Sequence, residues 1–558
     1  HDYAKSRFLK NRHCLSHFFV NMEEEITATA VEDLDIPSYQ DTPVEEQYID
    51  FQQHFITLST EQEETLNTSF PFILNGPAGS GKTMVAISLL QNLQQQRVGR
   101  ALYITASRNL KTHIQNLWRE MHDAHHSNQI QFFTYTEFLI DVLQVNSVDL
   151  VDEKHFHHWY QGLKKCPFEQ IKLEQEFRII SGYNDTPEVY LKLGEHQSLF
   201  CPTEREEVLK LFQLYAKALN SHLSLNLSRF KGSDSEGCFV IVDEAQDLSY
   251  AQLATLIEYG QRNTAILLGD HQVLYDGISR SQFVKDYFYQ QAIRHHIPTS
   301  QAVNTVSLNK TYRCASHVSL TTNDLIRLKY QVTGGKLDKT EVTELAVDHS
   351  KDGSVEWLDA QPEILHAIQH YHFKGDCAII NFSDDAPEDF NNPMIFTPQH
   401  SKGLEFDTII LWKPFQNLPT SLAANLKQNL SGENKATIHR AKAGRFNIEH
   451  LNYFNELITA FTRAKKRLVI VHPQPQHKRN PLAEEIQKIC SPISCFEETE
   501  IALNEETWLE KIIALLSQGF EEKAKSLFLS KLKQSTDAFE AFRRQVLFKP
   551  TLTSLDPH

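Results

Sequence analysis

The stretch that decides the fold is "FPFILNGPAGSGKTMVAISLL", residues 70–90. A short apolar run, a glycine-rich turn and a run of helix-forming residues predict a buried strand, a loop and a helix. Glycines let the backbone aim its N–H groups at phosphate oxygens, and the following helix adds the positive end of its dipole. The loop matches the pattern G-x-x-x-x-G-K-[ST], with residues Gly76, Pro77, Ala78, Gly79, Ser80, Gly81, Lys82 and Thr83. The stretch therefore predicts a phosphate-binding loop.

Two side chains of this loop and two later acids predict the chemistry. Lys82 is expected to reach the β- and γ-phosphates, and Thr83 to offer its hydroxyl to Mg²⁺. The stretch "CFVIVDEAQDLS", residues 238–249, predicts a buried strand that ends in two acids. Asp243 is expected to bind Mg²⁺ and Glu244 to polarise the attacking water. The alternative is an ordinary pair of acids at the polar end of a strand.

Other short apolar runs alternate with helical stretches along the chain. Each is short and rich in Val, Ile, Leu and Phe, as buried parallel strands are. They are "ALYIT" (101–105), "IQFFT" (130–134), "AILLGD" (265–270), "CAIINF" (377–382), "MIFT" (394–397), "TIILW" (408–412) and "RLVIVH" (467–472). This rhythm predicts an α/β fold with parallel sheets, and its two groups of strands predict two α/β domains.

Composition limits the classes of function. A net charge of −16 over 558 residues argues against a generally basic nucleic-acid coat, although it leaves room for a local basic groove. No apolar run approaches the ~18 residues that span a bilayer, so no membrane association is expected. The eight cysteines are scattered, which favours reduced thiols and a cytoplasmic protein.

Six fragments, in order, resemble the motifs of one enzyme family. Besides the phosphate loop, they are "LSTEQEETL" (58–66), "DEAQD" (243–247), "GDHQVLYDG" (269–277), "LNKTYRC" (308–314), "TPQHSKGLEFD" (397–407) and "ELITAFTRAKKRLVIV" (456–471). Each is weak alone, but their order and spacing make chance very unlikely. The chain resembles a superfamily-one helicase of the UvrD/Rep/PcrA type over most of residues 56–472. The resemblance implies two RecA-like P-loop domains, ATP and Mg²⁺ as cofactors, and 3′→5′ movement on a single strand.

The resemblance also implies roles for individual residues. Gln62 would read adenine, Gln272 would sense the γ-phosphate, and Tyr312 would stack on the base. From the second domain, Arg313 and Arg463 would reach the γ-phosphate. Gly403 and Glu405 would contact the nucleotide. The residues that would lie near the nucleic-acid strand are Thr105, Arg108, Thr134 and His400. For the threonines, the alternative is that hydroxyls at strand ends cap the following helices.

The expected domains follow from these motifs and from the helical stretches between them. They are an acidic N-terminal arm (1–50), a first RecA-like ATPase domain (51–139 and 226–305), a helical insertion (140–225), a second RecA-like domain (306–475) and a C-terminal helical region (476–558). The C-terminal region contains amphipathic helices on both sides of Gln518-Gly519, a candidate site for a protein partner.

Three features depart from the family. Gly277 and Ile278 stand where an aromatic residue normally stacks on a base. The large insertion expected within residues 314–396 is reduced or absent. An insert at 413–452 carries a basic stretch that is either a phosphate-contacting loop or a solvated one.

Two hypotheses remain at this stage. The first is an ATP-dependent translocase or helicase on single-stranded nucleic acid, with DNA favoured over RNA. The second is a nucleotide-gated module that uses the same cleft to bind a protein partner. The acidic charge and the missing aromatic favour the second, whereas the arginine pair favours real hydrolysis under either.

Overall fold

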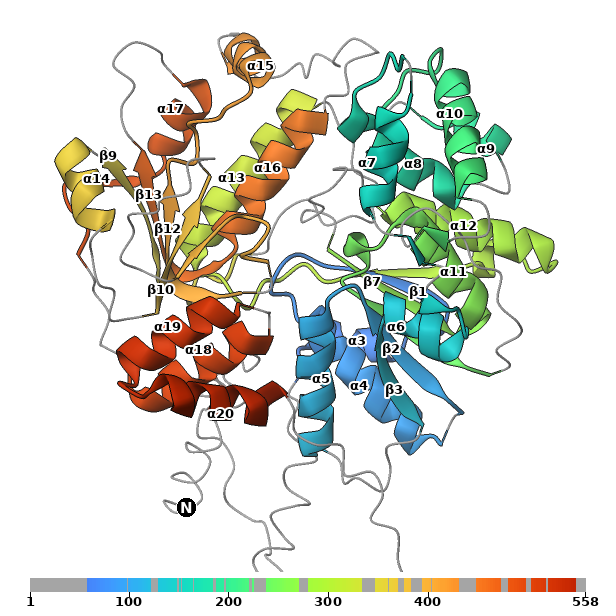
Figure 1. Ribbon diagram of the computed structural model, residues 1–558, viewed down its shortest axis with the longest axis horizontal. Coiled ribbons are helices and arrows are strands. Elements are labelled where there is room, and N and C mark those ends of the chain that lie inside the picture. The colour runs from blue at the N-terminus through green and yellow to red at the C-terminus, as the bar shows by residue number, and fades with distance from the viewer. Residues whose placement is uncertain are drawn as a thin grey trace, which may run out of the picture.

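The computed structural model describes residues 58–547, except 98, 122–128, 148–149, 152, 164, 184–186, 195–196, 220–222, 225–236, 270–279, 334–346, 360, 370–375, 383–393, 403, 431–447, 473–479, 498–502 and 518–519. The described chain forms two lobes, each built on its own β-sheet with helices against it (Figure 1). Both sheets have six strands, and all neighbouring strands are parallel. The predicted α/β class with two RecA-like lobes is therefore confirmed.

The first sheet has the order β3-β2-β6-β7-β1-β8. Its strands are β1 (Phe72–Asn75), β2 (Ala101–Thr105), β3 (Ile130–Thr134), β6 (Phe239–Asp243), β7 (Thr264–Leu268) and β8 (Asn304–Ser307). The phosphate loop follows β1 and the predicted acids follow β6, so both lie at the carboxyl edge of the sheet, where parallel α/β proteins bind ligands.

Alternate residues of these strands enter two different cores. Ile73 and Val242 face one core, while Leu74 and Ile241 face the other, as the two-residue period of a strand requires. Full burial of such a side chain contributes ~1.5–3 kcal/mol. The sheet is therefore covered on both faces, which suits its continuous apolar strands.

The helices of the first lobe divide between these cores. Helices α4 and α5 contribute to the core that contains Leu74, and helices α8, α10, α11 and α12 to the core that contains Ile73. The helices of this lobe are α3 (Thr60–Leu66), α4 (Lys82–Gln95), α5 (Arg108–Met121), α6 (Tyr135–Glu137), α7 (Glu153–Gln161), α8 (Gln170–Gly182), α9 (Pro187–Leu191), α10 (Arg205–Ala218), α11 (Tyr250–Gly260) and α12 (Ser281–Arg294). A π-helical turn at Phe138–Val142 follows α6, and a small parallel pair, β4 (Leu150–Val151) and β5 (Leu223–Ser224), lies among the inserted helices.

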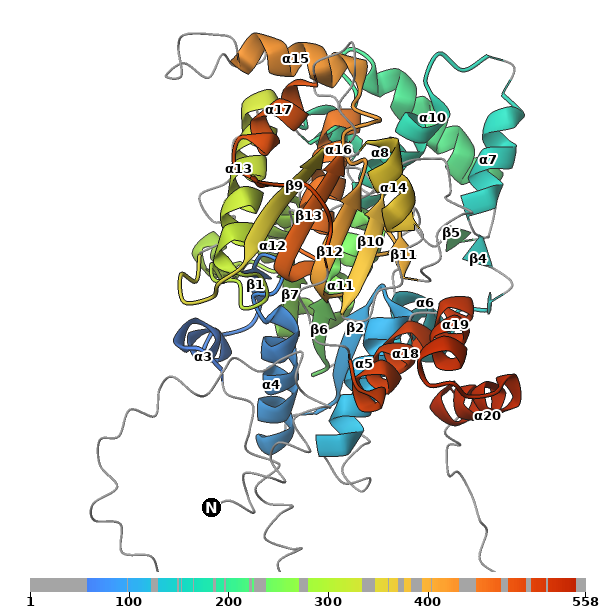
Figure 2. The same cartoon turned by 90° about the vertical axis from the view of Figure 1, so that its left-hand side faces the viewer.

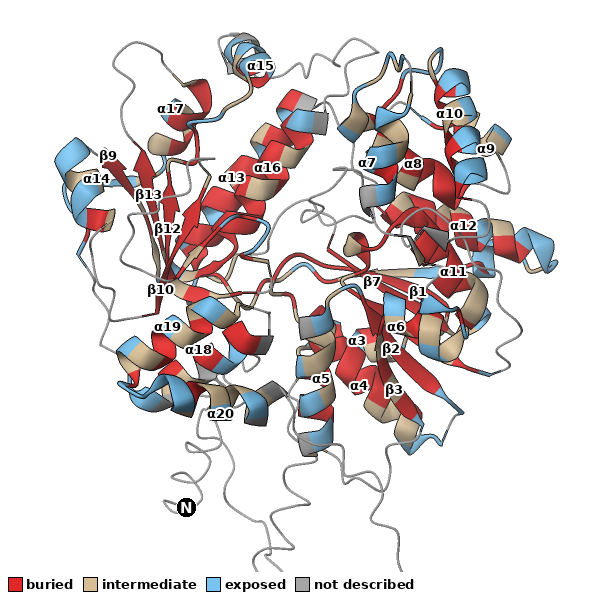
Figure 3. Ribbon diagram, viewed as in Figure 1, coloured by how far each residue is buried: buried red, intermediate tan, exposed pale blue. Residues whose placement is uncertain are grey.

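The second sheet has the order β11-β10-β12-β13-β9-β14. Its strands are β9 (Ser354–Asp359), β10 (Cys377–Asn381), β11 (Ile395–Phe396), β12 (Phe406–Trp412), β13 (Ala464–His472) and β14 (Ser491–Ile493). Its helices are α13 (Ser316–Thr333), α14 (Pro362–Gln369), α15 (Thr420–Leu430), α16 (Ile448–Phe461) and α17 (Pro481–Gln487). The strands of both sheets are largely buried, while α10 and α14 expose their outer faces (Figure 3).

Besides the small pair β4 and β5, three strands of the two six-stranded sheets were not among the predicted runs. β8 and β14 lie at sheet edges and are only partly buried, and β9 mixes polar with apolar residues in "SVEWLD". A strand in which only some residues are buried does not need a continuous apolar run, which is the pattern that predicted the other strands. β14 also shows that the chain after residue 476 adds a strand to the second sheet, besides its helices.

The C-terminal helices pack on the second lobe. They are α18 (Glu505–Ser517), α19 (Glu521–Lys531) and α20 (Thr536–Leu547). Their apolar residues, among them Trp508, Ile512 and Phe528, belong to the same core as the second sheet. Helix α18 also contacts α5 of the first lobe, and Figures 1 and 2 both show the two helices side by side. None of the helices in the described part of the chain is both long and apolar enough to cross a bilayer.

Candidate active site

The phosphate loop lies between β1 and α4, as the sequence predicts. Gly79 and Gly81 have φ angles of +74° and +79°, a region that glycine adopts without strain. A Cβ at Gly79 would collide with the Cβ of Arg313, and one at Gly81 with the amide of Gln62. The backbone conformation therefore favours glycine at both positions, and at Gly79 the close approach of Arg313 adds a second reason.

Lys82 begins helix α4 and is 5% exposed. Its ammonium donates hydrogen bonds to the backbone oxygens of Gly76 (2.9 Å) and Pro77 (3.0 Å). Burial lowers the pKa of Lys82, although the nearby acids Glu244 and Asp243 act to raise it. The ammonium thus lies inside the curve of the loop, where phosphate oxygens would replace the backbone carbonyls.

Gln62 links helix α3 to the same loop. Its side-chain amide donates to the backbone oxygen of Ser80 at 2.9 Å, and its carbonyl accepts from the backbone N–H of Ser59 in a capping box. This buried glutamine therefore lies against the phosphate loop. That position is compatible with its expected contact to the adenine base.

Asp243 ends strand β6 and is fully buried. Its Oδ2 accepts hydrogen bonds from the hydroxyl of Thr83 (2.7 Å) and from the phenol of Tyr103 (2.8 Å). Burial, together with the charge of Glu244, raises the pKa of Asp243 to about 6. A hydroxyl and a carboxylate in contact are hard oxygen donors of the kind that Mg²⁺ takes, so Thr83 and Asp243 fit the expected metal site.

Glu244 follows directly, with a left-handed φ of +50°. Although burial acts to raise it, the charges of Lys82 and Lys402 keep the pKa of Glu244 below its ordinary value. Its carboxylate also accepts a hydrogen bond from Gln246, whose own carbonyl accepts from the backbone N–H of Gly269 at 2.8 Å. Glu244 is thus held as a charged carboxylate that can accept a proton from water.

The segment 309–313, which leads from β8 into the second lobe, packs against the phosphate loop. The backbone N–H of Tyr312 donates to the oxygen of Gly79 (2.8 Å), and the hydroxyl of Thr311 donates to the oxygen of Ala78 (3.0 Å). Tyr312 is half-buried, and the ammonium of Lys310 lies 5.5 Å from the centre of its ring. This segment therefore places its side chains beside the loop that is expected to hold the phosphates.

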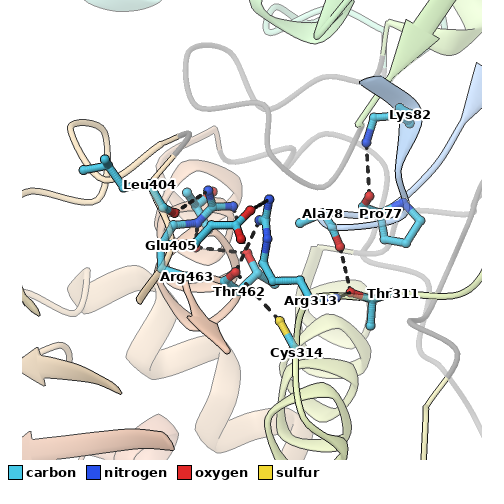
Figure 4. Close-up of polar contacts among 11 residues, drawn as sticks. Pro77, Ala78, Lys82, Thr311, Arg313, Cys314, Leu404, Glu405, Thr462 and Arg463 are labelled. Atoms are coloured by element: carbon cyan, nitrogen blue, oxygen red, sulfur yellow. Dashed lines mark hydrogen bonds and ion pairs between the residues drawn. The ribbon is translucent and has the colours of Figure 1, made fainter. Parts of the chain in front are cut away.

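Arg313 forms an ion pair with Glu405 of the second lobe. Arg463 lies beside this pair and is 2% exposed (Figure 4). Its guanidinium donates to the backbone oxygens of Thr459 (3.0 Å) and Leu404 (3.2 Å). Burial and the charge of Arg313 lower the pKa of Arg463 to about 9. The structure thus brings three predicted residues of the second lobe together.

Four residues of this site were not among the predicted ones. Gln246 positions Glu244, and Tyr103 of β2 contacts Asp243. Lys402 of the second lobe forms an ion pair with Asp247 of the first and so joins the two lobes. Gln246 and Asp247 lie within "DEAQD", and Lys402 within "TPQHSKGLEFD", so the quoted motifs contained a signal for three of the four. Nothing in the local sequence pointed to Tyr103.

Two predicted nucleotide contacts, Gln272 and Gly403, lie outside the described residues. So do Gly277, Ile278 and most of the basic stretch within 413–452.

Of the four residues predicted to lie near a nucleic-acid strand, two are buried and two are exposed. Thr105 and Thr134 are buried, and their hydroxyls accept hydrogen bonds from nearby backbone N–H groups, with Thr134 capping α6. Arg108 and His400 are exposed, and the ring of His400 lies 5.9 Å from that of Phe520. The Thr134 hydroxyl therefore has the capping role that was the alternative, whereas the Thr105 hydroxyl closes a local turn with the backbone N–H of Ser107.

The loop, the two acids and the parallel sheet define the class of the first lobe, a P-loop ATPase. A family model described as an AAA domain matches residues 61–277, less than half of the chain. No curated protein matches the sequence. One similar solved structure is described as "The structure of PRRSV helicase", with 11% identity over 75% of this chain and 55% of that one and a TM-score of 0.29. The chain thus spans about half the length of that helicase.

Proposed function

We propose that this protein is an ATP-dependent, Mg²⁺-requiring translocase or helicase of superfamily one, of the UvrD/Rep/PcrA type. Its track would be single-stranded nucleic acid, DNA rather than RNA, with 3′→5′ movement by family resemblance. The observation that carries the proposal is the divided site: Lys82 and Asp243 belong to the first lobe, whereas Glu405 and Arg463 belong to the second.

The residues at this site would act together when ATP binds. The backbone of the loop and Lys82 would hold the β- and γ-phosphates, and Glu244 would accept a proton from the attacking water. A bound Mg²⁺ would neutralise charge between the phosphates, held through Thr83 and Asp243. Arg313 would leave Glu405 and, with Arg463, stabilise the charge that develops on the transferred phosphoryl group.

Because both lobes would contribute to the γ-phosphate site, hydrolysis would change the contacts between them. A hinge movement that follows such differential contacts is a common means of coupling a nucleotide to motion. If each lobe grips a strand in turn, cycles of closure would move the protein along it. Cytoplasmic location is part of the proposal and is supported by the seven free cysteines in the described part of the chain.

The second candidate is a nucleotide-gated module that binds a protein partner. The net charge of −16 and the capping role of Thr134 favour it. The C-terminal helices give it less support than their sequence suggested, because their apolar side already packs on the second lobe.

ATP turnover with and without single-stranded DNA, and then RNA, separates the two candidates. It is measured at low and at moderate salt, because phosphate contacts weaken steeply as salt rises. Lys82→Ala is the blank. Strong stimulation by one kind of strand supports the translocase and identifies its track, whereas turnover that ignores both strands supports the partner-binding module.

A further inference from the structure

Tyr103, a residue of strand β2 that lies outside the predicted motifs, has its phenol hydroxyl at the proposed nucleotide site. It is the middle residue of β2 and is completely buried, on the face of the sheet that α4 and α5 cover. Its ring packs against Phe132, with 5.7 Å between centroids. Its hydroxyl donates to Oδ2 of Asp243 at 2.8 Å. A core tyrosine thus has its polar end at the predicted metal ligand.

The strand register explains this contact. β2 and β6 are parallel neighbours in which Thr105 pairs with Asp243 and Tyr103 pairs with Ile241. Tyr103 therefore lies two residues, about 6.6 Å, before the level of Asp243 and on the same face of the sheet. A long side chain with a terminal hydroxyl spans that distance, whereas a shorter hydroxyl-bearing residue at this position would not.

The contact differs from the one that Thr83 makes to the same oxygen. The Thr83 hydroxyl is itself an expected ligand of Mg²⁺, so it has a second role besides its hydrogen bond to Asp243. The Tyr103 phenol has no such second role and stays with the carboxylate. Oδ1 of Asp243 meanwhile accepts from the backbone N–H of Glu244 at 2.9 Å. Each of the two carboxylate oxygens thus has a hydrogen-bond donor of the first lobe.

We propose that Tyr103 is a positioning residue that fixes the carboxylate of Asp243 for metal–nucleotide binding. This inference rests on the proposed function, because it takes Asp243 as a Mg²⁺ ligand. Partners that orient a metal ligand commonly change metal affinity by about 10- to 100-fold when they are removed. If Tyr103 only fills the core, phenylalanine would replace it without any effect on metal binding.

Tyr103→Phe removes only the hydroxyl, and Tyr190→Phe is its matched control. Tyr190 is also a buried tyrosine of the first lobe, and its hydroxyl donates at 2.8 Å to a buried carboxylate, Glu176, in the inserted helices. Both substitutions therefore remove one phenol–carboxylate hydrogen bond, but only one of the two carboxylates belongs to the proposed site.

The readout is Mn²⁺ affinity for the protein–ADP complex, measured by electron paramagnetic resonance, beside the Mg²⁺ concentration at half-maximal ATP turnover. Metal-free ADP binding and urea unfolding establish that each variant is folded under the assay conditions. We expect Tyr103→Phe to weaken Mn²⁺ binding about 10-fold or more, with metal-free ADP binding unchanged, and Tyr190→Phe to leave both at the wild-type level.

Wild-type Mn²⁺ affinity in Tyr103→Phe would overturn the positioning role and leave the proposed function standing. An equal loss of Mn²⁺ affinity in both variants would also overturn it, because the effect would then come from general destabilisation. A wild-type protein that binds ADP but no Mn²⁺ at Asp243, with Asp243→Asn as reference, would overturn the metal site on which both proposals depend.

Discussion

The nucleotide cleft and the surface expected to hold a nucleic-acid strand are built in different ways. In the cleft, Lys82 and Asp243 are almost completely buried, and each has at least two hydrogen bonds. On the expected strand surface, Thr134 is used as a helix cap, whereas Arg108 and His400 are exposed. A buried network with satisfied partners is rigid and specific, whereas exposed side chains bind a strand mainly by charge. The side chains expected to bind ATP are therefore preorganised by the fold, whereas those expected to bind a strand are not.

The largest effect is expected from the buried arginine of the second lobe. Arg463→Ala should reduce ATP turnover by about 10³-fold or more, because arginines on a transferred phosphoryl group contribute ~10³–10⁵. Arg205→Ala is the matched control: Arg205 is equally buried and also donates to backbone oxygens, but it lies in the inserted helices. Wild-type turnover in Arg463→Ala would contradict a site shared by two lobes.

Lys82→Ala should lower turnover by about 10²–10³-fold, the cost of losing one electrostatic contact in a preorganised site. The overall fold should persist, because within the described residues the hydrogen bonds of the Lys82 ammonium go to its own loop. Turnover assays and urea unfolding measure the two effects, and the buried Lys285→Ala of α12 is the control for losing a buried ammonium. Turnover within tenfold of wild type would remove the basis for calling the cleft catalytic.

The ion pair across the cleft tests whether the lobes are coupled. Lys402→Ala and Asp247→Ala should each lower turnover about five- to tenfold, and the double variant should be no worse than either, which corresponds to ~1 kcal/mol of coupling. Lys111 and Glu137 provide a comparison pair within the first lobe, 2.9 Å apart. Additive losses for Lys402 and Asp247 would mean that the contact does not link the lobes functionally.

The smallest effects distinguish the two kinds of residue on the strand surface. Thr134→Ala should lower the free energy of unfolding by about 1 kcal/mol, the usual cost of losing a helix cap, with little change in strand affinity. Arg108→Ala should leave stability unchanged and reduce the salt dependence of single-strand binding by about 0.7 in the log–log slope. Urea unfolding and salt titrations of strand binding measure both. A loss of single-strand affinity in Thr134→Ala, with unchanged stability, would instead show that Thr134 contacts the strand.

The features that rest on local chemistry could be predicted from neighbouring residues. Left-handed φ angles at Gly79 and Gly81 need glycine, and continuous apolar runs need burial on both faces of a sheet, so both could be read from neighbouring residues. The placement of Lys82, Thr83 and Asp243 at one sheet edge followed as well, because the carboxyl ends of parallel strands lie at one edge.

Tertiary structure alone decided contacts that depend on register and on the approach of distant segments. Tyr103 reaches Asp243 because β2 and β6 are neighbours in a particular register, although 140 residues separate the two in sequence. Lys402 meets Asp247 because the two lobes are in contact at this point. The C-terminal helices bury their apolar side on the second lobe, a choice that amphipathic periodicity leaves open. Periodicity and motifs specify which side chains need a partner, and only the packed chain specifies which partner each one finds.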